Sequence, residues 1–118
     1  MKETQIQQAI LHYLQLLENQ GVVYAFRNNS FQGHVTRRYY TKSRGVVHTQ
    51  GYIKNAKRGM PDIIVCANGR FVGLEVKRQG NYQTEVQKLA QEQIEGAGGL
   101  YFVVRSVDDA EKAIKSVL

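Results

Sequence analysis

The sequence predicts an α/β domain in which helices flank a central mixed sheet. Two apolar runs meet at Asn68-Gly69, the strongest short signal for a two-residue β-hairpin turn. Residues 3–19, 83–97 and 107–117 repeat their apolar side chains at helical spacing. The apolar run 100–104 follows the second helical segment, and a helix between two strands supplies the crossover that parallel pairing requires. The sheet is therefore expected to mix antiparallel and parallel strands.

The chain before this hairpin is expected to form one helix and three strands. Gly21 is a natural stop for the helix at 3–19. The run 22–27, rich in β-branched and aromatic residues, predicts the first strand. Two further β-like runs, 35–41 and 46–53, are expected to form a hairpin that protrudes from the domain.

The strands of the core hairpin are expected at about 61–67 and 70–77. Cys66 is the only cysteine, so it cannot form a disulfide within the chain, and its apolar neighbours predict a small buried side chain. In the helix at 83–97, Leu89 belongs to the stripe expected to face the sheet. The core order is then helix, three strands, helix, strand, helix.

Length and composition predict one domain over residues 1–118. The hydrophobic content of 42% is normal for a globular chain. No apolar run approaches the roughly 18 residues of a membrane span. The first residues, Met1 to Gln5, lack the apolar segment of a signal peptide, so we expect a cytoplasmic protein of a bacterium or a phage-infected host cell.

Positive charge is concentrated in the middle of the chain. The net charge is +6 and the pI is near 9.6, which favours an anionic partner. No Asp or Glu occurs from Asn19 to Pro61. Half of the 16 Lys and Arg lie there: Arg27, Arg37, Arg38, Lys42, Arg44, Lys54, Lys57 and Arg58. Interleaved aromatics make this basic segment suited to a phosphate backbone and exposed bases, unless the aromatics pack in the fold and the charges form a solvated face.

Three polar side chains are expected to converge at one end of the core hairpin. Pairing about the turn places Asp62 close to Glu75, and alternation along the strand puts Glu75 and Lys77 on one face. Two carboxylates are oxygen ligands of the kind that Mg²⁺ or Mn²⁺ takes. A lysine beside them can orient or deprotonate a metal-bound water. Two alternatives stay open: a catalytically silent nucleic-acid-binding module, and a metal-independent interaction protein whose acidic pair is structural.

Pro61-Asp62 followed by Glu75-Val76-Lys77 resembles the Pro-Asp…(Asp/Glu)-x-Lys nuclease signature. Glu3, Arg27-Asn28-Asn29, Gly59-Met60 and Gln87 extend the resemblance to the VRR-NUC branch, the virus-type replication-repair nucleases, over roughly residues 3–118. The resemblance implies a restriction-endonuclease-like core: a central mixed sheet, flanked by helices, with the site at one edge. It also implies a Mg²⁺-dependent endodeoxyribonuclease in which Mn²⁺ can substitute.

The resemblance further assigns roles to particular residues. The implied metal ligands are Glu3, directly or through water, Asp62, Glu75 and the backbone carbonyl of Val76. Lys77 would position the attacking water, and Gln87 would brace Lys77 or that water. The implied DNA contacts are Arg27, Asn28, Arg37, Arg38, Lys42, Arg44, Lys57 and Arg58, of which the first two follow the first strand as in the family.

Substrate and assembly follow from the same resemblance. A domain of 118 residues has limited surface for reading a base sequence, which favours recognition of DNA shape such as forks, flaps or four-way junctions. Stand-alone members of the family resemble junction-resolving enzymes that act as two-fold dimers, because a four-way junction needs two paired cuts. We therefore expect branched DNA as the substrate and a homodimer as the active form.

Overall fold

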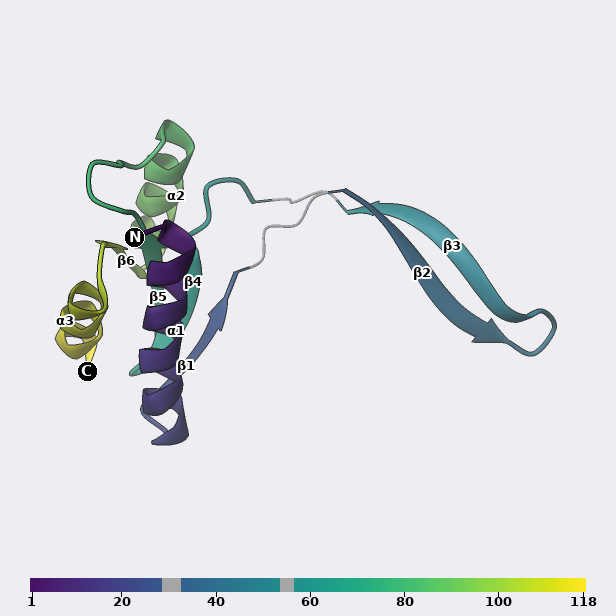
Figure 1. The fold of residues 1–118 in the computed structure, drawn as a ribbon, viewed down its shortest axis with the longest axis horizontal. Coiled ribbons are helices and arrows are strands. Elements are labelled where there is room, and N and C mark those ends of the chain that lie inside the picture. Colours follow the sequence, from purple (N-terminus) through teal and green to yellow (C-terminus); the bar gives the residue numbers. More distant parts are fainter. Residues whose placement is uncertain (29–32, 54–56) are drawn as a thin grey trace.

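The computed structural model describes residues 1–28, 33–53 and 57–118, and for residues 33–35 and 53 it describes the backbone alone. Figure 1 shows a sheet packed with helices and a long hairpin extending from it. The elements in chain order are α1 (Glu3–Asn19), β1 (Val23–Arg27), β2 (Gly33–Thr41), β3 (Gly45–Ile53), β4 (Ile63–Ala67), β5 (Arg70–Val76), α2 (Glu85–Gly96), β6 (Leu100–Val104) and α3 (Val107–Val117). The helices and strands predicted from the sequence are present, with ends that differ by one or two residues at most.

The central sheet has the strand order β1-β4-β5-β6 and is mixed, as predicted. β1, β4 and β5 pair antiparallel, and β6 pairs parallel to β5 after the crossover through α2. The turn between β4 and β5 has φ of 53° at Asn68 and 76° at Gly69. These positive angles are what a type I′ turn requires, and they fix the register in which Ile63 pairs with Leu74.

The two faces of the sheet differ in their cover. α1 and α3 pack on one face, where Ile10, Leu14 and Ile114 meet Ile63 and Leu74 in the main core. The opposite face carries Glu75 and meets α2. Within the described ranges, no helix is both long enough and apolar enough to cross a membrane.

α2 covers only part of its face of the sheet, and two predicted burials are therefore wrong. α2 packs against β6 and does not cover Cys66 of β4, which is exposed. Tyr24 and Phe26 of β1 are exposed on the same sheet. Leu89 is 54% exposed because it lies about 100° around the helix from Ala90, the residue that α2 buries.

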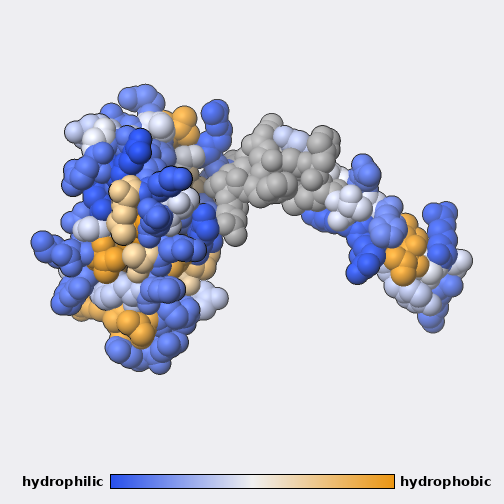
Figure 2. Space-filling model, viewed as in Figure 1, coloured by the Kyte–Doolittle hydropathy of each residue, from blue (hydrophilic) through white to orange (hydrophobic). Residues whose placement is uncertain are grey.

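β2 and β3 form a second, two-stranded antiparallel sheet, which we call the β2–β3 arm (residues 33–53). The arm confirms the predicted protruding hairpin: Figure 1 shows it reaching away from the central sheet, and the molecule is 56 Å in its longest extent. Its tip is closed by the Thr41 hydroxyl, which accepts from the Arg44 backbone N–H at 3.1 Å. Figure 2 shows a mostly hydrophilic arm with a small apolar patch near its far end.

Candidate active site

The carboxyl groups of Asp62 and Glu75 lie together at the end of the β4–β5 hairpin. Asp62 directly precedes β4, and the register places it opposite Glu75 on the face that meets α2. Asp62 Oδ2 accepts from the backbone N–H of Val76 at 2.8 Å, which turns the carboxylate toward β5. The two carboxyl groups are close enough to share a hydrogen bond. The site is therefore an acidic pair, of which Glu75 is only 2% exposed.

Burial makes it unfavourable for this pair to carry two negative charges. Loss of hydration, followed by the charge of Asp62, raises the pKa of Glu75 to about 8. Burial also raises the pKa of Asp62. The hydrogen bond from the Val76 N–H and the charge of Lys77 lower this pKa but only partly offset the effect of burial. Lys77 is half-buried two residues beyond Glu75 on the same side of β5, and its charge lowers the pKa of both carboxyl groups.

The donor set fits a divalent cation. Glu75 Oε2 is buried, and apart from a proton shared with Asp62 it has no hydrogen-bond partner among the described residues. An unpartnered buried carboxylate oxygen beside a second carboxylate is costly in the protein alone, and a divalent ion would supply the missing positive charge. In the described part of the chain, no group of three or more His, Cys, Asp or Glu side chains is arranged to hold a metal. The fit is thus to two carboxylates, with water or substrate oxygens as further ligands.

Gln87 supports Glu75 from the first turn of α2. Its Nε2 donates to Glu75 Oε1 at 2.7 Å. The resemblance implied that Gln87 braces Lys77 or the attacking water, but its partner in the structure is the Glu75 carboxylate. Gln87 Oε1 also accepts from the backbone N–H of Thr84, and the Thr84 hydroxyl accepts from the Gln87 N–H. This reciprocal capping box begins the helix and at the same time fixes the amide that holds Glu75.

The loop before β4 is held tightly against α2 and β1. Gly59 has φ of +74°, and a Cβ there would lie 2.6 Å from the carbonyl carbon of Val86, so glycine is required by conformation and by space. On the other side, Asn28 donates from its backbone N–H to the Asp62 carbonyl at 2.8 Å and from Nδ2 to the Pro61 carbonyl at 3.2 Å. Asn28, expected to contact DNA, is therefore engaged with the protein's own site.

Glu3 lies near the acidic pair but binds the loop that follows β5. Its Oε2 accepts from the Arg78 backbone N–H at 3.1 Å and from Asn81 Nδ2 at 3.0 Å. The Asn81 bond is the main reason that the pKa of Glu3 is lowered. Arg105 holds the same loop through the carbonyls of Arg78 and Asn81, at 2.7 and 2.8 Å. The charge of Glu3 reaches Asp62 and Glu75 and raises the pKa of each, which makes Glu3 a neighbour of the pair.

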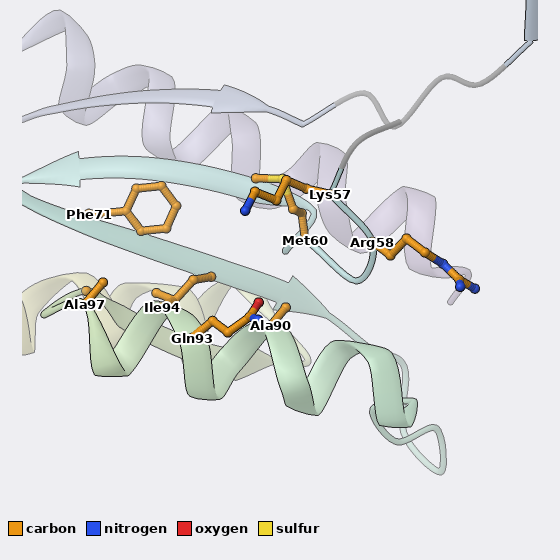
Figure 3. Close-up of a pocket in the computed structure, with 9 residues that line it drawn as sticks. Lys57, Arg58, Met60, Phe71, Ala90, Gln93, Ile94 and Ala97 are labelled. Carbon is orange, nitrogen blue, oxygen red and sulfur yellow. The ribbon is translucent and has the colours of Figure 1, made fainter. Parts of the chain in front are cut away.

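The predicted DNA-contacting cations fall into two groups. Arg27 ends β1, and Lys57 and Arg58 line a groove of about 330 Å³ between the sheet and α2. In Figure 3 Lys57, Met60 and Phe71 lie along this groove, and Arg58 points away from Phe71. The second group is on the β2–β3 arm, where Arg37, Arg38, Lys42 and Arg44 are all exposed. Lys54 lies outside the described residues.

Two residues near the site were not found from the sequence. Tyr101 of β6 pairs with Gly73, and its hydroxyl is buried near the carboxylates. Burial raises the pKa of Tyr101 to about 12, and the charges of Glu75 and Asp62 add to this. Arg105 was also missed. Tyr101 lies in the apolar strand β6, and Arg105 directly follows it. Only the pairing of β6 with β5 could have indicated that these two residues come near the site.

No family model matches the chain, and no curated protein matches it. The chemistry of the site has therefore to be argued from its own residues. A buried pair of carboxylates, a lysine on the same face and an amide that orients one carboxylate can bind a divalent cation and place it beside a negatively charged substrate.

Proposed function

We propose that this chain is a metal-dependent DNA endonuclease of the VRR-NUC type, with a restriction-endonuclease-like core, that hydrolyses phosphodiester bonds. The observation that carries the proposal is the Asp62–Glu75 pair: Glu75 is 2% exposed, and apart from a proton shared with Asp62 one of its oxygens has no hydrogen-bond partner among the described residues. Such a pair destabilises a protein that does not use it. The Lys77 ammonium on the same face and the acid-free basic segment that directly precedes Asp62 in the sequence support phosphodiester chemistry on a polyanion.

Each residue has a distinct task in this proposal. Asp62 and Glu75 would hold Mg²⁺, for which Mn²⁺ could substitute, and the carbonyl of Val76 would be a further ligand. When bound, such an ion would supply a lower pKa for the attacking water and positive charge opposite the phosphate. Lys77 orients the attacking water and neutralises part of the same charge. Gln87 is a positioning residue, because its amide fixes the Glu75 carboxylate and leaves the other oxygen toward the ion.

Branched DNA is the substrate that we propose, and a homodimer is the proposed active form. The basic residues lie in two separate places, beside the site and along the β2–β3 arm, which suits a substrate with more than one duplex segment. Two copies related by a two-fold axis would place two sites for paired cuts in a four-way junction.

Cleavage of end-labelled DNA tests the proposal. A four-way junction, a fork and a linear duplex are incubated with the protein in Mg²⁺, in Mn²⁺ and in EDTA. We expect cleavage in either metal, none in EDTA, and none by Asp62→Ala or Lys77→Ala, both of which should still bind DNA. Asp108→Ala and Lys112→Ala, which remove the same charges from exposed positions on α3, should cut like the wild type.

The outcomes separate the candidate functions. Full cleavage by Asp62→Ala would contradict the proposed site. DNA binding without cleavage in either metal would identify a silent nucleic-acid-binding module. Light scattering gives the mass of the assembly, and a monomer that cuts only the linear duplex would rule out the junction-resolving version while leaving the nuclease.

A further inference from the structure

The β2–β3 arm presents two chemically different faces. Residues paired across two antiparallel strands share a face, and successive pairs alternate. One side, the Arg38 face, carries Thr36, Arg38, Tyr40, Val46, His48, Gln50 and Tyr52. The other side, the Arg37 face, carries Arg37, Tyr39, Thr41, Val47 and Thr49. Each face has one arginine, but among the described side chains of the arm the glutamine and the histidine both lie on the Arg38 face.

The arm has the exposure and charge expected of an element that binds a partner. A hairpin of two strands is at best marginally stable alone in water, because it lacks a packed face. Its side chains stay exposed on both sides: Arg37, Arg38, His48 and Gln50 are open to solvent, and Tyr40 is 73% exposed. Residues 33–53 contain no acidic residue, so their charge is wholly positive and complements a polyanion. A second copy of the chain would bring the same positive charge, which disfavours it as the occupant.

The described residues that flank the arm on either side of it in the sequence lie beside the acidic pair. Asn28, which precedes the arm, is bonded to the carbonyls of Pro61 and Asp62. Lys57 and Arg58, which follow it, lie at the groove next to the same loop. In the sequence, the arm is therefore inserted between two segments that lie at the site.

We infer that the β2–β3 arm lies in the major groove of the duplex next to the scissile phosphate, with the Arg38 face toward the base edges. This inference rests on the proposed nuclease function and adds to it the mode of duplex recognition. The major groove admits a two-stranded β-ribbon, whereas the minor groove is about half as wide. Arginine and glutamine are the side chains that pair with guanine and adenine edges in that groove, and both occur on the Arg38 face.

The length of the arm sets the length of duplex it needs. Each strand has nine residues, which span about 30 Å at the rise of an antiparallel strand. At about 3.4 Å of helix axis per base pair, this sets an upper limit of roughly nine base pairs, because the major groove runs obliquely to the axis. Affinity should therefore rise with duplex length up to about 10 base pairs on the side of the arm, and change little beyond it.

Fluorescence anisotropy in EDTA, where the proposed chemistry is switched off, tests the inference on the full chain. Arg38→Ala and Arg37→Ala form a matched pair, because they remove the same charge from adjacent exposed positions of β2. We expect Arg38→Ala to weaken binding to a 16-base-pair duplex about tenfold and Arg37→Ala about two- to threefold. Replacing guanine with 7-deazaguanine, which removes the N7 acceptor from the major groove, should weaken the wild type but not Arg38→Ala.

Several results would overturn the inference. Equal losses of duplex affinity for the two variants would show that the arm contributes only non-specific positive charge. Displacement of the protein by distamycin, which occupies the minor groove, would show that the arm binds in the minor groove. Variants that change the mass of the assembly but not DNA binding would make the arm a contact between copies. If the wild type binds as expected but never cuts, the nuclease proposal is contradicted and groove binding stands. If the wild type cuts while Arg37→Ala and Arg38→Ala bind alike, groove binding is contradicted and the nuclease proposal stands.

Discussion

Removing the charge of Glu75 should stabilise the metal-free protein while it destroys cleavage. Glu75 has a pKa of about 8 in the folded chain, against an ordinary value of 4.5. As the pH rises through 4.5, the unfolded chain loses a proton that the folded chain keeps, so the free energy of unfolding falls until the pH reaches about 8. The slope is about 1.4 kcal/mol per pH unit, which gives a loss of roughly 3 kcal/mol at pH 7.

Glu75→Gln cannot ionise, so it should escape this loss. Its amide can still accept from Gln87 through its oxygen and can donate to Asp62 through its nitrogen. At pH 7 in EDTA, we expect the melting temperature followed by circular dichroism to rise by about 10 °C, since about 1 kcal/mol corresponds to 4 °C in a domain of this size. At pH 4.5 the wild type and the variant should melt together.

A matched substitution and a metal titration complete this test. Glu92→Gln removes an exposed carboxylate from α2 and should shift the melting temperature little at either pH. Added Mg²⁺ should stabilise the wild type at pH 8 and leave Glu75→Gln unchanged. If Glu75→Gln is less stable than the wild type at pH 7, or if the difference is the same at pH 4.5, the buried carboxylate is not the source of strain that we infer.

Two further predictions concern the supports of the site. Gln87→Leu and Thr84→Ala both break the capping box of α2, and each should lower the free energy of unfolding by about 1 kcal/mol. Only Gln87→Leu, which also removes the hydrogen bond to Glu75, should lower kcat. Equal kcat values for the two variants would show that Gln87 stabilises the helix and does not position Glu75. Gly59→Ala should destabilise the fold by several kcal/mol more than Gly80→Ala, measured by urea denaturation, because both glycines have positive φ but only Gly59 has backbone atoms where a Cβ would go; similar losses would mean that the loop before β4 can move away from α2.

The elements of this fold could be predicted because each has a local signal. The Asn68-Gly69 turn fixes the register of β4 and β5, and that register alone brings Asp62 to Glu75. Helical spacing gave all three helices, since their apolar stripes are long enough to be unambiguous. The acidic pair was thus accessible from the sequence because two strands joined by a tight turn leave little freedom in pairing.

The parts that could not be predicted depend on contacts between distant segments. Glu3 accepts from Asn81, 78 positions away, and no periodicity indicates that this loop folds over the start of α1. Cys66 and Leu89 are exposed because α2 leaves part of its sheet face open. Hydrophobic patterning shows which face of an element is apolar, but it does not show whether another element covers that face.

Calorimetric titration of Mn²⁺ into the protein tests the central claim most directly. At pH 7 Glu75 should hold a proton, so ion binding should release about one proton, measured from the dependence of the heat on buffer ionisation enthalpy. We expect Mn²⁺ to bind the wild type with this release and to bind neither Asp62→Asn nor Glu75→Gln. Equal binding by all three proteins, or no binding by the wild type, would contradict the claim that these two carboxylates form a metal site.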